Sequence, residues 1–303
     1  MHITRVAQAG GTQFIGRPLG ARRFSIALLR RKLSKVSLPV ILAIFVLTVI
    51  LLCAVIPGAF APYGPTDMDS DAVLSPPGLH HWLGTDHFGR DILSLLIYGA
   101  GQSVVMALGT VAIAVTVGGT IGLITGYVGG LTDFVVMRLV DVWLSVPQMM
   151  LAIIIATALR ASFTHTILAV GIVLVAPFVR MIRGQVMSVR ARPFIAASHA
   201  IGTGHATIIL RHVLPHCAAP LLVMATIAVA MSILIASALS FIGIGVIEDR
   251  PDWGFLLSQG HNYLTVAWWY PTFPGLAITA LVISVNALGN ALRIRLDPRT
   301  VRR

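Results

Sequence analysis

Residues 37–60 read SLPVILAIFVLTVILLCAVIPGAF and contain no charged side chain. A helix rises 1.5 Å per residue, so about 20 apolar residues cross the roughly 30 Å hydrocarbon core of a membrane. A basic cluster precedes this run, as in a signal peptide. However, the run is longer than the apolar core of a signal peptide, about 7–15 residues, and no clear small-residue cleavage pattern follows it. We therefore expect residues 36–60 to form a first, retained transmembrane helix.

The rest of the chain continues this pattern. Hydrophobic residues make up 56% of the 303 residues and charged residues only 11%, too few charges to cover the surface of a water-soluble globule. We expect five further spans, at residues 103–125, 134–159, 166–181, 218–239 and 272–292. The sequence thus predicts an all-α membrane protein with six transmembrane helices.

The formal net charge of +11 could suggest a nucleic-acid-binding protein. Lys and Arg accumulate, however, in the cytoplasmic segments of membrane proteins. Six spans with both termini in the cytoplasm place 19 of the 22 Lys and Arg residues inside and 8 of the 11 Asp and Glu residues outside. The charge therefore indicates membrane orientation, and no nucleic-acid partner is needed to explain it.

This topology divides the chain into segments. Residues 1–35 are expected to be a cytoplasmic tail, and residues 61–102 an extracytoplasmic segment ending in the amphipathic helix GRDILSLLIYG. Residues 103–303 form the expected core. Within the core we expect an inner loop at 183–216, an outer loop at 240–271 and a cytoplasmic tail at 293–303.

The inner loop reads RGQVMSVRARPFIAASHAIGTGHATIILRHVLPH. We expect a short helix over residues 193–201, a break at 202–204, and a second short helix from His205 that Pro215 ends or kinks. Neither helix is long enough to span. Such a pair could transmit force at the cytoplasmic face, or could be a simple amphipathic connector.

No pattern in the sequence indicates catalysis, a metal site or a cofactor. The only two lysines are Lys32 and Lys35, so the chain lacks the glycine-lysine loop that binds ATP. Neither Cys nor acidic residues complete a metal shell around His80, His81 and His87 at a recognisable spacing. The charged residues at the inner ends of the spans, Arg138, Asp141 and Arg180, are expected to reach to the membrane interface.

The inner loop resembles the EAA loop of bacterial ABC importer permeases. Ala197 matches its second position, Gly202 its glycine, and Leu214 and Pro215 its closing pair, whereas Ala196 and Ser198 replace the usual Glu and Ala. Further segments resemble the C-type subunit of the dipeptide, oligopeptide and nickel permeases. These are HWLGTDHFGRDILSLLIYGAGQS (81–103), RHVLPH (211–216), LSFIGIG (239–245), PDWG (251–254) and NALGNALRIRLDPR (286–299).

The resemblance implies a non-enzymatic permease subunit that moves peptides across the bacterial inner membrane by alternating access. Its EAA loop would be the coupling helix that contacts an ATPase, with Ala197, Ser198, Gly202, Leu214 and Pro215 as the coupling residues. The implied partners are a B-type permease, two ATPase subunits that bind ATP and Mg, and an extracytoplasmic substrate-binding protein. Nickel, glutathione or opines are alternative substrates. A self-sufficient channel or secondary transporter is the rival class, followed by a membrane-embedded enzyme.

Overall fold

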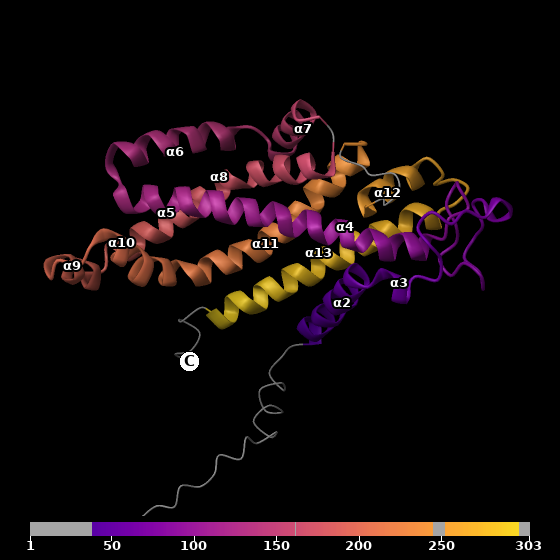
Figure 1. Ribbon diagram of the computed structural model, residues 1–303, viewed down its shortest axis with the longest axis horizontal. Coiled ribbons are helices and arrows are strands. Elements are labelled where there is room, and N and C mark those ends of the chain that lie inside the picture. The colour runs from indigo at the N-terminus through magenta and orange to yellow at the C-terminus, as the bar shows by residue number, and fades with distance from the viewer. Residues whose placement is uncertain (1–37, 161, 245–251, 297–303) are drawn as a thin grey trace, which may run out of the picture. The chain divides into compact units, whose positions relative to one another are not determined.

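The computed structural model describes residues 38–160, 162–244 and 252–296, and this part of the chain contains helices but no strand. Five helices are long and apolar enough to cross a membrane, and a bent helix pair raises the number to six if it counts as one span. The prediction of an all-α membrane fold is confirmed. Figure 1 shows the helices running alongside one another.

The candidate membrane spans of the described residues follow one another in this order: α2 (Leu38–Val55), α4 with η2 and α5 (Ile92–Val128), α6 (Gly130–Ser145) with α7 (Gln148–Ala158), α8 (Phe163–Arg190), α10 with η3 and α11 (His205–Phe241), and α13 (Trp269–Leu296). The shorter elements are α3 (Pro57–Phe60), η1 (Ser70–Ala72), α9 (Pro193–Ala200) and α12 (Trp253–His261). α8 packs against α4, α5 and α11, while α2 packs against α4 and α13.

The second span is longer than expected. It begins at Ile92 rather than at residue 103, so the amphipathic stretch expected before the span is its first part. A π-helical turn, η2 (Ala114–Gly118), lies within it. After this turn, small residues allow the backbones of α5 and α8 to approach closely: a Cβ on Gly122 would lie 2.7 Å from the carbonyl oxygen of Val179.

The third expected span, residues 134–159, is a bent helix pair rather than one straight helix. α6 and α7 meet at an angle of 95° across Val146 and Pro147. Pro147 has no backbone N–H to donate and disfavours a helical conformation at Val146, which is extended (ψ 132°). The hydrophobic run predicts the span, and Pro147 within it is the sequence signal for the bend.

The sequence predicts a second short helix from His205 that Pro215 ends or kinks, and the predicted end at Pro215 is wrong. The helix from His205 continues through Pro215 and Pro220 to Phe241. A π-helical turn, η3 (Ile209–Val213), directly precedes Leu214 and Pro215. Such a turn accommodates an extra residue where proline disturbs the ordinary hydrogen-bond pattern, so the helix passes the proline without ending.

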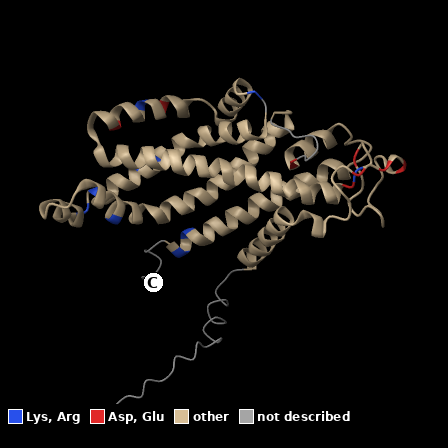
Figure 2. Cartoon of the chain, viewed as in Figure 1, with Lys and Arg blue, Asp and Glu red and all other residues tan. Residues whose placement is uncertain are grey.

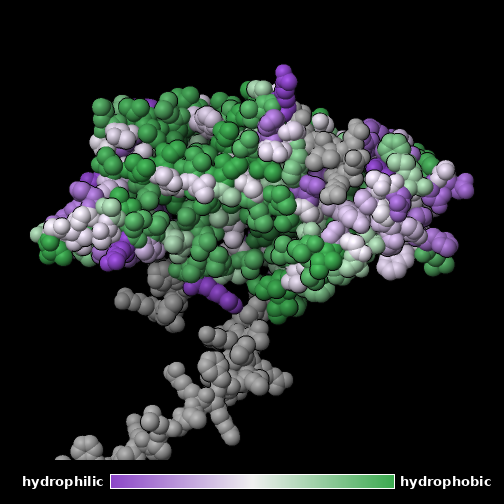
Figure 3. All heavy atoms as spheres, in the orientation of Figure 1, coloured by the Kyte–Doolittle hydropathy of each residue, from purple (hydrophilic) through white to green (hydrophobic). Residues whose placement is uncertain are grey.

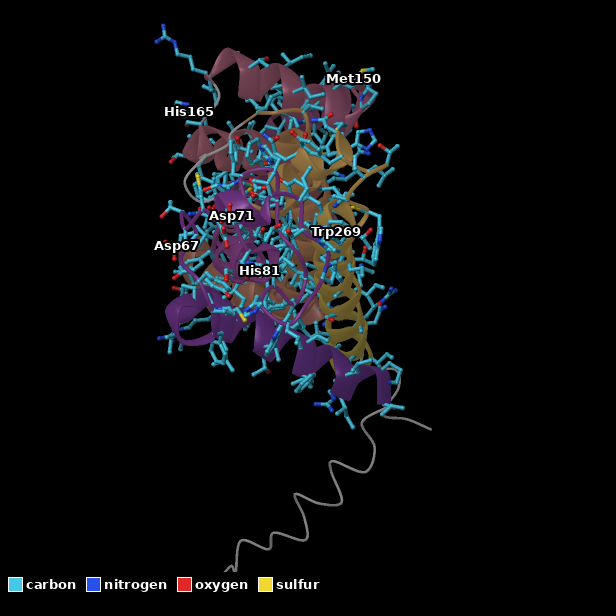
Figure 4. All side chains as sticks on the ribbon, turned by 90° about the vertical axis from the view of Figure 1, so that its right-hand side faces the viewer. Asp67, Asp71, His81, Met150, His165 and Trp269 are labelled. Atoms are coloured by element: carbon cyan, nitrogen blue, oxygen red, sulfur yellow. The ribbon has the colours of Figure 1, made fainter. Side chains whose placement is uncertain are left out.

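The segment of residues 61–91, here called the capping segment, covers one end of α4 and α13. Asp91 caps α4 by accepting hydrogen bonds from Ser94 (N and Oγ, both 2.8 Å), and Asp86 binds the buried Arg90 (Oδ2 to Nε 2.7 Å). Trp269 on α13 donates its indole N–H to the carbonyl oxygen of Thr85 (3.3 Å). Figure 4 looks onto this end, with Asp67, Asp71 and His81 from the capping segment and Trp269 from α13.

Polar and apolar surfaces are separated along the helices. Figure 3 shows hydrophobic residues covering much of the sides of the helices, and Figure 2 shows charged residues gathered near the two ends and on α6. Large apolar side chains of α2 and α6 are exposed, including Leu38 (78%) and Leu131 (79%). Such exposure suits lipid or a partner helix rather than water.

Candidate coupling site and its relatives

The short helix α9 is bounded by clear local signals. Pro193 occupies its first turn, where the missing N–H costs nothing. At its end, Gly202 has φ +77° and donates to the carbonyl oxygen of His199 (3.0 Å), and Thr203 donates to that of Ser198 (3.1 Å). This pair of bonds is a Schellman motif, which needs the left-handed conformation that glycine adopts readily. The expected break at Gly202 is therefore a helix C-cap.

Apolar packing anchors α9 to the long helices. Ile195 is fully buried in a cluster with Val186 of α8, Ile208 and Val213. The Phe194 ring stacks on that of His216 near the start of α11, with 5.4 Å between the centroids. α9 thus contacts both the end of α8 and the beginning of α11.

A second contact joins this region to α5. The Tyr127 hydroxyl lies 2.9 Å from Nδ1 of His205, and Tyr127 is buried in the same cluster as Ile195. The His199 and His205 rings are 5.1 Å apart. The ends of α5 and α8 and the start of the His205–Phe241 helix are therefore linked around α9.

The outer surface of α9 is small and uncharged. Ala196, Ala197 and Ala200 are exposed, and Ile201 is 82% exposed. Exposed arginines flank this surface at positions 190, 192 and 211. A surface of small apolar side chains flanked by arginines can fit into a groove of a partner protein if acidic residues line the edges of that groove.

The five predicted coupling residues lie in two elements. Ala197, Ser198 and Gly202 belong to α9 and its cap, and Ser198 directs its hydroxyl to the carbonyl oxygen of Phe194 (2.8 Å). Leu214 and Pro215 belong to α11, and their side chains are exposed. Sequence reasoning missed the anchors Phe194, Ile195 and Tyr127. Phe194 and Ile195 could have been recognised as apolar residues directly after Pro193, whereas no feature of the sequence indicated that Tyr127 contacts this region.

The described residues hold no group of three His, Cys, Asp or Glu side chains placed to bind a metal ion. Cys53 and Cys217 are free thiols within helices. The exposed face of α9 therefore offers surface for a protein partner.

Residues 118–302 match the family described as "binding-protein-dependent transport system inner membrane component". The chain belongs to this family. It is similar to the probable D,D-dipeptide transport system permease protein DdpC of Escherichia coli K12, with 35% identity over 93% of this chain and 95% of the relative. It is also similar to the di/tripeptide transport system permease protein DppC of Pseudomonas aeruginosa, with 37% identity over 82% and 84%.

A third relative carries a different substrate in its name. The glutathione transport system permease protein GsiD of Pectobacterium atrosepticum is 33% identical over 76% of this chain and 77% of its own length. Membership of the inner-membrane-component family makes this chain a multi-pass membrane permease of a binding-protein-dependent transport system. The resemblance to the C-type subunit is confirmed by these relatives.

Proposed function

We propose that this chain is the C-type permease subunit of an ATP-driven importer of short peptides. It would pair with a B-type permease, two cytoplasmic ATPases that bind ATP and Mg, and an extracytoplasmic binding protein. The observation that carries the proposal is α9: a small exposed helix, capped at Gly202 and anchored to two long helices, in a chain of this transport family.

The anchoring explains how force could pass from an ATPase into the membrane helices. Ile195 packs with Val186 of α8, and Phe194 stacks on His216 of α11. Because protein interiors are close-packed, a displacement of α9 is transmitted to both helices rather than absorbed. Closure of the ATPases would then shift α8 and α11 together, between inward-open and outward-open states.

The orientation follows from the same proposal. α9 must face the cytoplasm to meet an ATPase, which puts the capping segment outside, where the binding protein docks. Exposed arginines lie around α9, and Asp67, Asp69 and Asp71 lie exposed in the capping segment. This distribution agrees with the preference of Arg and Lys for the cytoplasmic side. Both termini are then cytoplasmic.

The substrate proposal rests on relatives. The names of two of them specify dipeptides or tripeptides, and a third specifies glutathione, itself a small peptide-like molecule. We therefore favour di- and tripeptides, with glutathione as the alternative that a relative supports.

Co-purification tests the assembly. The chain would be expressed with the transport genes next to its own and isolated in detergent, with Ala197→Cys introduced on the exposed face of α9. We expect an ATPase subunit to co-purify and to cross-link to Cys at position 197. Leu38→Cys, exposed on α2 outside the α9 cluster, is the control and should not cross-link. A preparation in which no ATPase associates would refute the proposal.

A further inference from the structure

α6 carries a polar stripe inside a membrane span. The stripe consists of Arg138, Asp141 and Ser145, whose spacing by three and four residues places them on one face of the helix together with exposed Phe134. The Arg138 guanidinium lies over the Phe134 ring, 5.4 Å from its centroid. Asp141 accepts a hydrogen bond from Arg180 of α8. The expectation that these charged groups reach to the membrane interface did not include this pairing between α6 and α8.

The stripe is badly suited to lipid. The side chains of Asp141 and Arg180 are each 49% exposed. Charged side chains on a spanning helix are costly in lipid, so such residues face protein or water. The neighbouring face of α6 carries exposed Leu131, Leu139 and Val142, which suit lipid. α6 therefore has one exposed face for lipid and another for a polar environment.

The same polar stripe ends at the break in the span. Ser145 is the last residue of α6, and the chain then turns by 95° through Val146 and Pro147. Exposed Gln148 follows at the start of α7. Irregular backbone at membrane depth is tolerated where it is covered by protein or lines a water-filled cavity. The broken spans of transporters often form substrate sites for this reason.

A second ion pair also joins α6 to α8. Asp133 of α6 receives two hydrogen bonds from Arg183 of α8, at 2.5 and 2.6 Å. Their side chains are only 17% and 27% exposed. Two hydrogen bonds therefore join α6 to α8 at Asp133 and Arg183, whereas the side chains of the Asp141–Arg180 pair are half exposed.

We propose that the polar stripe of α6 lines the peptide path and that Asp141 and Arg180 bind the opposite charges of a peptide's termini. Arg180 would take the carboxylate and Asp141 the ammonium group, each exchanging its partner in the protein for the substrate. A charge pair that exchanges partners in this way keeps both charges compensated throughout passage. This inference rests on the proposed function, because it takes the substrate to be a zwitterionic peptide.

Cysteine accessibility tests the inference in the assembled transporter. Ser145→Cys on the stripe and Leu139→Cys on the apolar face of the same helix would each be made with Cys53→Ala and Cys217→Ala. A charged methanethiosulfonate reagent should label position 145 at least about tenfold faster than position 139, because the charged reagent is excluded from lipid. Alanyl-alanine, supplied with the binding protein and ATP, should slow the labelling of position 145 several-fold.

Two results would overturn the inference. Failure of Ser145→Cys to react would mean that the stripe packs against the partner permease, and labelling that alanyl-alanine does not slow would mean that the peptide does not contact it. Asp141→Asn gives a second readout: we expect it to raise the KM for alanyl-alanine uptake while the complex still assembles. Asp133→Asn, the matched control, should lower the yield of folded complex instead. Uptake by the parent complex tests the proposed function separately.

Discussion

At the scale of single residues, Asp252 combines two roles that pull in opposite directions. Its Oδ1 caps α12 by accepting from the Phe255 amide (3.0 Å), and its Oδ2 accepts from the Ser240 hydroxyl of α11 (2.7 Å). The residue is only 6% exposed, and burial raises the pKa of its carboxyl group above the usual value. Capping needs only an oxygen acceptor, whereas burial penalises the negative charge.

This conflict predicts a pH dependence of stability. A carboxyl group whose folded-state pKa is raised contributes most below its unfolded-state pKa, and this contribution is lost as the pH rises through the folded-state pKa. Asp252→Asn keeps an acceptor for α12 without the charge. The variant should therefore gain thermal stability relative to the parent as the pH rises above the ordinary carboxyl pKa of about 4, measured as Tm in detergent at pH 5 and at pH 8. Asp252→Ala, which lacks both the charge and the cap, should be about 1 kcal/mol less stable than Asp252→Asn at both pH values. A Tm difference between Asp252→Asn and parent that is the same at both pH values would contradict this account.

At the scale of elements, the sequence predicted the number and kind of spans better than their continuity. Hydrophobic runs identify a span, but the 95° bend at Pro147 and the unbroken helix through Pro215 depend on whether neighbouring turns accommodate proline. The π-helical turn before Leu214 has no signature in hydrophobicity. The sequence shows several glycines in the stretch that forms α5, but only the structure shows which of them contact α8.

Those glycines give a packing prediction. A Cβ on Gly122 would lie 2.7 Å from the Val179 carbonyl oxygen, whereas one on Gly119 would meet nothing within 4 Å. Gly122→Ala should therefore separate α5 from α8 and cost about 1–3 kcal/mol. Gly119→Ala should be neutral or stabilising by up to about 1 kcal/mol, because alanine favours helix. Thermal unfolding of the two purified variants compares them, and equal Tm values would show that the close contact is unimportant.

At the scale of the whole molecule, the sequence located α9 but not the residues that anchor it. The EAA-like spacing identified Ala197 and Gly202, which lie on one helix and its cap. The anchors Phe194, Ile195 and Tyr127 come from elements that meet only in the folded chain. The central claim is that α9 receives movement from an ATPase and passes it to α8 and α11.

The most direct test is the amount of peptide imported per ATP hydrolysed by the reconstituted complex. Gly202→Asp places a side chain at φ +77° in the cap of α9, while Gly204→Asp adds the same charge two residues later at an ordinary φ of −65°. Gly204 is the N-cap residue of α10, a position at which aspartate is favourable. We predict that Gly202→Asp still inserts and hydrolyses ATP but imports little peptide, whereas Gly204→Asp imports as the parent does. Normal import per ATP by Gly202→Asp would contradict the coupling role of α9.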